Sequence, residues 1–177
     1  MDTQKIIIVI AFIAFVVVSF VIKETVNKRK GESGEDMEKV RRVVAKLLPD
    51  SSSYTIVYTY YIDNKYVGNN RTSCYYHYAV AFKPGKLFVA PISYNDGEVG
   101  HKNGTLMTKE NLGRIQLKGG SPILFDKAGK ELCTLHVIAS NTRQSKYEPF
   151  NIQQKEQADA FNAFIKAFAN EVNRAHS

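Results

Sequence analysis

An apolar run near the N-terminus constrains this chain more than any other feature. Residues Ile6 to Ile22 read IIIVIAFIAFVVVSFVI, and Ser19 is their only polar member. As a helix with a rise of 1.5 Å per residue, the run covers ~26 Å, close to the thickness of a bilayer's hydrocarbon core. A helix in a soluble core keeps a polar face, whereas this one is apolar on all sides. We therefore predict a single-pass transmembrane anchor over residues 1–26.

The basic residues beside this run predict its direction across the membrane. Lys5 precedes it, whereas Lys23, Lys28, Arg29 and Lys30 follow it. Because positive residues flanking a span favour the cytoplasmic side, we expect the rest of the chain in the cytoplasm, with these four cations beside lipid headgroups. A cleavable secretory signal is the competing interpretation. The length of the run and the lack of a small-x-small cleavage site after it oppose that interpretation.

The residues after the anchor divide into a linker and one domain. Residues 27–36 read NKRKGESGED, a charged, glycine-containing stretch that is typical of a solvated linker. Residues Met37 to Leu48 repeat apolar side chains at spacings of three and four, which predicts a short amphipathic helix. Asp36 is its expected cap, and Pro49 ends it. We expect residues 37–177 to form a single soluble α+β domain.

The segment from Tyr54 to Ile138 has the two-residue period of β-strands and is rich in β-branched and aromatic residues. Turn residues such as Lys83-Pro84-Gly85-Lys86 interrupt it. The candidate strands are Tyr54–Ile62, Thr72–Phe82, Leu87–Ile92, Thr105–Met107, Arg114–Leu117, Ile123–Phe125 and Glu131–Ile138. Six or seven short strands joined by turns predict an antiparallel sheet or a small barrel.

One long amphipathic helix, Ile152 to Arg174, is predicted to follow the strands. Asn151 is its expected N-cap, with Gln154 reaching back in a capping box. Its apolar stripe carries three phenylalanines at spacings of three and four, which require a large apolar partner. We expect Phe164 or Phe168 to be among the most buried side chains.

This order of elements resembles the pleckstrin-homology-like fold, including its bacterial versions. The segments KLFVAPI (residues 86–92) and NLGRIQL (residues 111–117) are similar to the way in which such domains run a strand into a further pair. The resemblance covers residues 51–174. It implies a sheet capped by the terminal helix. Lipid-binding members carry basic residues in the first hairpin loop, whereas residues 63–71 hold few here, so phosphoinositide recognition is not implied.

Six tyrosines on two adjacent candidate strands are the most unusual local feature. Alternate tyrosines can stack across a sheet and form its outer face. Exposed tyrosine is also favoured at protein interfaces. The candidate partner surface consists of Tyr58, Tyr60, Tyr61, Tyr75, Tyr76 and Tyr78.

No pattern in the sequence identifies a catalytic, cofactor or metal site. The four histidines are scattered and lack the spacing of metal ligands. The formal net charge is +7, but the basic residues of the domain are spread singly, which disfavours a nucleic-acid surface. We therefore predict a membrane-tethered, non-enzymatic binding or scaffolding module with a protein partner, no cofactor and no bound nucleic acid.

Two alternatives remain open. The domain could be an extracytoplasmic part of an envelope or secretory assembly, where Cys74 and Cys133 could form a disulfide. In the cytoplasm the same two cysteines are expected to be small buried apolar residues. The other alternative is an enzyme of a class that the sequence does not identify.

Overall fold

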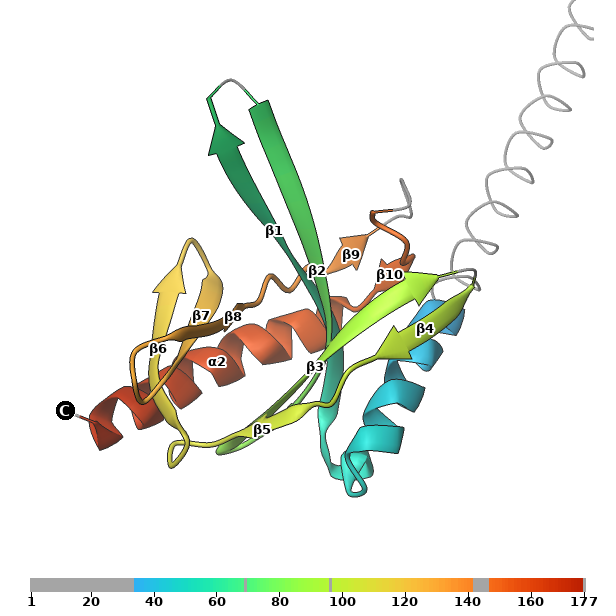
Figure 1. Ribbon diagram of the computed structural model, residues 1–177. Helices are drawn as coiled ribbons and strands as arrows, with labels where there is room; N and C mark the ends of the chain where they lie inside the picture. The colour runs from blue at the N-terminus through green and yellow to red at the C-terminus, as the bar shows by residue number, and fades with distance from the viewer. Residues whose placement is uncertain (1–33, 69, 96, 142–146, 177) are drawn as a thin grey trace, which may run out of the picture.

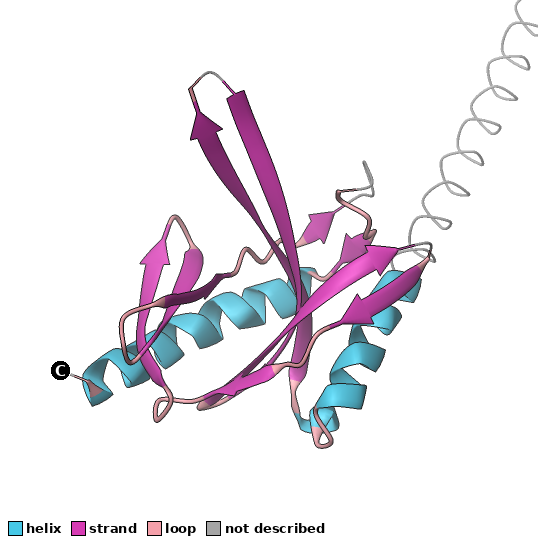
Figure 2. Ribbon diagram, in the orientation of Figure 1, coloured by secondary structure: helices cyan, strands magenta, loops and turns pink. Residues whose placement is uncertain are grey.

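The computed structural model describes residues 34–68, 70–95, 97–141 and 147–176 of the 177-residue chain. The predicted anchor at Ile6 to Ile22 and its basic flank lie outside these ranges. Among the residues described, no helix has the length and apolar character needed to cross a bilayer. The described part is α+β and consists of antiparallel sheets and two α-helices (Figure 2), as the sequence predicts.

The largest sheet has five antiparallel strands in the order β1-β2-β3-β4, with β5 pairing beside β3. The strands are β1 (Thr55–Val67), β2 (Asn70–Lys83), β3 (Lys86–Asn95), β4 (Glu98–His101) and β5 (Thr105–Met107). A 3₁₀ turn, η1 (Ser51–Ser53), leads into β1. The predicted turn at residues 83–86 is confirmed, since Lys83 pairs with Lys86 and Gly85 takes a φ of 73°.

Two further sheets take up the remaining strands, so the strands do not form the single sheet or barrel that the sequence predicts. One sheet has β6 (Leu112–Lys118), β7 (Ser121–Asp126) and β8 (Glu131–Thr134). The other pairs β9 (Ser140–Asn141) with β10 (Ile152–Gln153). Register shifts interrupt the second sheet, and Gly113 permits one of them, because a Cβ there would meet the Asp126 carbonyl oxygen.

One face of the five-stranded sheet packs against α2 (Lys155–Ala175) and the β6–β8 sheet. Val57 and Val80, which pair across β1 and β2, point to this side. Phe168 of α2 is among the most buried side chains here, as predicted, while Phe164 is partly buried. The buried residues of this core are Val57, Val80, Phe82, Leu87, Val89, Met107, Leu112, Ile115, Leu124, Cys133, Leu135, Phe161, Ile165, Phe168, Ala169 and Val172.

The opposite face of the same sheet packs against the helix over residues 34–47, which lies away from α2 (Figure 1). Successive strand residues point to opposite faces, so Tyr58 and Ala79 face this second core. Its buried residues are Met37, Val40, Val43, Val44, Leu48, Tyr54, Tyr58, Ala79, Ala81, Phe88, Ala90, Ile92, Phe150 and Ile152. The sheet is therefore covered on both faces.

The predicted caps of both helices are wrong, because tertiary contacts use the capping residues differently. The first helix already includes residue 34, and the Asp36 carboxylate accepts a hydrogen bond from the backbone N–H of Asn151 at 2.8 Å. Asn151 precedes β10, so α2 starts at Lys155 with Gln154 as its N-cap residue. The side chain of Gln154 turns inward to the sheet instead of capping the helix.

The β1–β2 hairpin is longer than predicted and projects from the body of the domain (Figure 1). Residues 63–71, expected as the first hairpin loop, lie largely within the two strands, which continue to Val67 and Asn70. Asn64 Oδ1 accepts hydrogen bonds from Arg71 and Ser73 across the ribbon, which supports these polar residues in extended form. We call residues 61–76, beyond the point where β2 leaves β3, the arm.

Candidate functional site

The six candidate tyrosines lie on two opposite faces of the β1–β2 hairpin and so do not form one surface. Tyr61 pairs with Tyr76, and Tyr78 follows on the same face of β2. The other three, Tyr58, Tyr60 and Tyr75, point to the side of the 34–47 helix. Tyr58 is only 1% exposed and cannot contact a partner, whereas Tyr76 is 41% exposed.

Two of the tyrosines on the 34–47 helix side, Tyr58 and Tyr60, belong to an aromatic cluster at the base of the arm, whereas Tyr75 stacks on Tyr147. A hydrogen bond of 2.7 Å joins Tyr58 Oη and His77 Nδ1, and the Phe150 ring lies 4.8 Å from the Tyr58 ring. Burial raises the pKa of Tyr58 well above its usual value and lowers the pKa of His77, although the backbone of Tyr147 opposes the second shift. Both side chains are thus neutral near pH 7 and hold the cluster together.

The other three tyrosines line a pocket of about 270 Å³ between the arm and β8. Tyr61 and Tyr76 stack with their ring centroids 6.5 Å apart. Residues 131–134 of β8 form the facing wall. Two carboxylates line the pocket as well, Asp63 from β1 and Glu131 from β8.

The two carboxylates differ in whether a cation lies beside them. Asp63 lies 3.7 Å from the ammonium of Lys65. Glu131 accepts a hydrogen bond from Thr134 Oγ1 at 2.9 Å and has no cationic partner among the residues that the structure describes. A negative charge therefore remains beside the tyrosine rings of the pocket.

Two further ionisable groups of the pocket, Tyr78 and Cys133, are held in their neutral forms. Burial raises the pKa of Tyr78, and the neighbouring Cys133, Tyr76 and Glu131 raise it further. Burial, with a smaller contribution from Glu131, raises the pKa of the Cys133 thiol to about 12. Only the thiolate is nucleophilic, so Cys133 is unsuited to covalent catalysis. Cys133 and the half-buried Cys74 are both free thiols.

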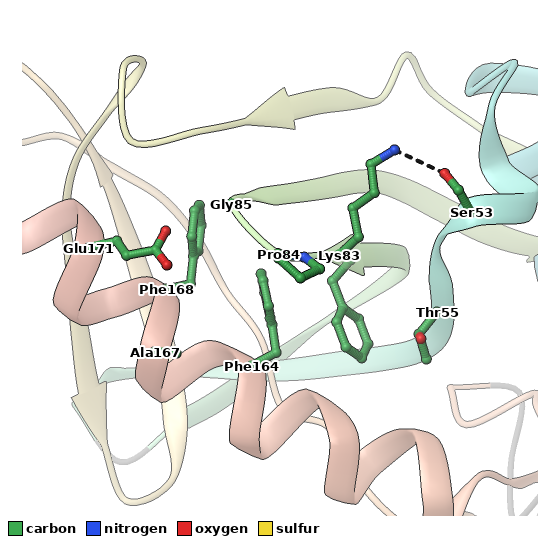
Figure 3. Close-up of a pocket in the computed structure, with 10 residues that line it drawn as sticks. Ser53, Thr55, Lys83, Pro84, Gly85, Phe164, Ala167, Phe168 and Glu171 are labelled. Atoms are coloured by element: carbon green, nitrogen blue, oxygen red, sulfur yellow. Dashed lines mark hydrogen bonds between the residues drawn. The ribbon is translucent and has the colours of Figure 1, made fainter.

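A second cavity is an apolar groove of about 320 Å³ between α2 and the β2–β3 turn (Figure 3). The Phe164 and Phe168 rings and Pro84 line it. Lys83 also lines it, and its ammonium donates to Ser53 Oγ and Asp50 Oδ2, both at 2.9 Å. The Asp50 carboxylate raises the pKa of Lys83, so this cation stays charged and internally paired. The groove thus offers mainly apolar surface, and Lys83 and Ser53, which also line it, are hydrogen-bonded to each other and to Asp50.

Two of the histidines, His77 and His136, take structural positions. His77 bonds to Tyr58, while the exposed His136 contacts Ser121 Oγ at 3.0 Å and pairs through its backbone with Tyr60. In the described ranges, no three His, Cys, Asp or Glu side chains lie where they could hold a metal ion.

Sequence reasoning missed Asp63 and Glu131 as members of the site. Asp63 falls in the stretch expected as the first hairpin loop, and Glu131 stands at the start of a strand some seventy residues further on. Their meeting depends on how the three-stranded sheet sits against the hairpin, and no local pattern encodes that. The alternation of Tyr76 and Tyr78 along β2 was the one available signal.

Comparison with known proteins gives this arrangement no relative. No family model matches the chain, and neither a curated protein nor a solved structure matches it.

Proposed function

We propose that this protein is a membrane-tethered, non-enzymatic binding module that holds a basic side chain of a protein partner in the pocket of Tyr61, Tyr76 and Tyr78. The observation that carries the proposal is the convergence of these three rings with the Glu131 carboxylate, which has no cationic partner among the described residues. Aromatic faces attract cations by ~0.5–2 kcal/mol, and a carboxylate adds a charge-assisted hydrogen bond. The pocket therefore suits an arginine or lysine side chain.

A protein partner is favoured because the pocket lies at the base of an arm that offers further contact surface. At the far end of the arm, Tyr66 and Val67 are 69% and 78% exposed. One basic side chain contributes little affinity alone, and specific protein interfaces bury ~1,200–2,000 Å² in total. The arm extends the surface on which a partner can add contacts to the single side chain in the pocket.

We also propose that the domain has a pleckstrin-homology-like fold, and its architecture supports this proposal. A five-stranded and a three-stranded antiparallel sheet precede one terminal helix, and α2 packs on both β1 and β6. This order and packing agree with a pleckstrin-homology-like domain. The apolar run Ile6 to Ile22 is the proposed tether, with the domain on its cytoplasmic side.

The proposal is tested by titrating the full chain, in neutral detergent, with N-acetyl-arginine amide. The chain has ten tyrosines and no tryptophan, so ¹³C labelling of tyrosine rings yields a small set of signals. We expect the signals of Tyr61, Tyr76 and Tyr78 to move with a millimolar Kd, which corresponds to roughly −4 kcal/mol. The Glu131→Gln variant should bind several-fold more weakly.

Two controls make the test specific. N-acetyl-glutamine amide has a similar size without the charge, and Glu156→Gln removes an equal charge from an exposed position of α2. The neutral probe should leave the tyrosine signals in place, and Glu156→Gln should bind the arginine probe as tightly as the wild type does. Equal movement with the neutral probe, or unchanged binding in Glu131→Gln, would refute cation recognition. A photo-crosslinker at Tyr76 that captures only lipid in native membranes would refute a protein partner.

A further inference from the structure

A third cavity, of about 230 Å³, lies between the 34–47 helix and the β3–β4 hairpin. It is separate from the tyrosine pocket, and no residue lines both. The helix contributes Lys39, Arg42, Val43 and Lys46, and the hairpin contributes Gly97, Glu98, Val99 and His101. Three cations and one carboxylate therefore surround a small open space.

The three cations converge because of their helical spacing. Lys39, Arg42 and Lys46 stand at positions i, i+3 and i+7, which lie on one face of a helix. The helix is held in place by its buried side chains, including Val40 and Val44. The cationic face of the helix therefore has a fixed position relative to the β3–β4 hairpin.

The charges of this pocket are only partly neutralised. The Lys39 ammonium lies 3.2 Å from a Glu35 carboxylate oxygen and 3.5 Å from an Asp36 carboxylate oxygen. Arg42 and Lys46, by contrast, form no ion pair within the ranges that the structure describes. Two positive charges are therefore available to a ligand, against the single lining carboxylate of Glu98.

His101 adds an unused polar atom to the same pocket. Its Nδ1 is shielded from solvent and has no hydrogen-bond partner in the described part of the chain. Buried polar atoms nearly always have a partner, and His101 lines the pocket, so a ligand bound there is the candidate partner of this ring nitrogen.

We infer that this pocket binds a phosphate group, carried by a phospholipid headgroup or by a soluble phosphate ester. The planar guanidinium of Arg42 can donate two parallel hydrogen bonds to phosphate oxygens. The Lys46 ammonium supplies a second charge, and the His101 ring a further hydrogen bond when Nδ1 carries a proton. The inference does not depend on the tyrosine pocket or on its partner.

The direct test follows the ¹⁵N ring signal of His101 in the full chain, reconstituted in phosphatidylcholine nanodiscs and titrated with inorganic phosphate at constant ionic strength. We expect a saturable shift of the Nδ1 signal. A second preparation contains phosphatidic acid, which presents the same group on a lipid. If the His101 signal in the phosphatidic acid preparation is displaced before any phosphate is added, and phosphate shifts it no further, the ligand is a headgroup. If added phosphate shifts the signal as far as in phosphatidylcholine alone, the ligand is soluble.

Matched variants show whether the response belongs to this pocket. Arg42→Gln and Lys46→Gln should each weaken phosphate binding about tenfold, since each removes a charge-assisted contact. Arg41→Gln removes the same charge from the neighbouring residue, which pairs with Glu38 instead, and should bind normally. All three positions are exposed, so the variants should fold. An absent His101 response, or an equal loss in Arg41→Gln, would overturn the inference.

Discussion

At the outer edge of β1, the Gln154 side chain makes hydrogen bonds of the kind that a neighbouring strand would make with the backbone. Its Oε1 accepts from the Tyr58 N–H at 2.9 Å, and its Nε2 donates to the carbonyl oxygens of Tyr58 and Ile138 at 2.8 and 2.9 Å. The side chain is 1% exposed, so water cannot take over these bonds. Buried backbone groups that lose a partner are costly, which makes Gln154 a structural residue in a position where sequence reasoning expects a helix cap.

We predict that Gln154→Ala lowers the free energy of unfolding by about 2–4 kcal/mol, because it orphans several buried backbone groups. Urea unfolding monitored by circular dichroism measures the change. Gln153→Ala is the matched control, since this neighbour is exposed and pairs with Ser140 through its backbone alone. A similar loss in both variants would show that the three hydrogen bonds are not the cause.

His77 gives the protein a pH dependence whose sign is fixed by burial. Its pKa lies below the ordinary value of 6.5 because the ring is partly desolvated. The unfolded chain then binds more protons than the folded one as the pH falls through 6.5, so stability is full above this value and declines below it. We predict a lower Tm at pH 5.5 than at pH 7.5, and a smaller difference in His77→Gln. An unchanged difference would exclude His77 as its source.

At the scale of elements, the 34–47 helix is held by its apolar face more than by its cap. Val44 is fully buried against the sheet, while the adjacent Ala45 is exposed. We predict that Val44→Asp destabilises the domain by about 3–5 kcal/mol, because it buries a charge without a partner. Ala45→Asp should change stability by less than ~0.5 kcal/mol. Thermal unfolding of the two variants checks this, and equal Tm values would mean that the helix is not docked as described.

Elements whose apolar residues recur with a regular period were predictable from the sequence, and elements that depend on pairing with distant strands were not. The stripe from Met37 to Leu48 and the phenylalanines of α2 predict their helices because burial follows the helical period. The short strands β4 and β9, in contrast, have little apolar alternation and exist through pairing with β3 and β10. The polar outer part of the arm was not predicted either, because it too has little apolar alternation.

At the scale of the whole molecule, the candidate site was predictable in part. The sequence picks out the tyrosines, but their division between two faces follows from the register of Tyr61 with Tyr76. Which acids and bases join them depends on packing between sheets and helices that are distant in sequence. Through that packing Glu131 comes to line the same pocket as the tyrosines, and His101 the same pocket as Arg42.

The predicted anchor is tested on the full chain in membranes. We expect sodium carbonate extraction to leave the wild-type chain in the pellet, because Ile6 to Ile22 remain in lipid. Ile13→Lys combined with Val16→Lys should release it, since each central lysine costs ~2.5–3.5 kcal/mol in the bilayer. Lys5→Gln, outside the run, should not. A wild-type chain found in the supernatant would contradict the tether.

The hydrogen bond from Asn151 to Asp36 spans 115 residues, and it joins the helix that opens the domain to the segment just before α2. During translation, the strands β1 to β5 leave the ribosome well before the residues that complete either core. A nascent chain halted at β8 lacks α2 and therefore exposes the apolar sheet face that this helix covers, a state that favours aggregation and chaperone binding. Productive folding has to wait until synthesis is almost complete.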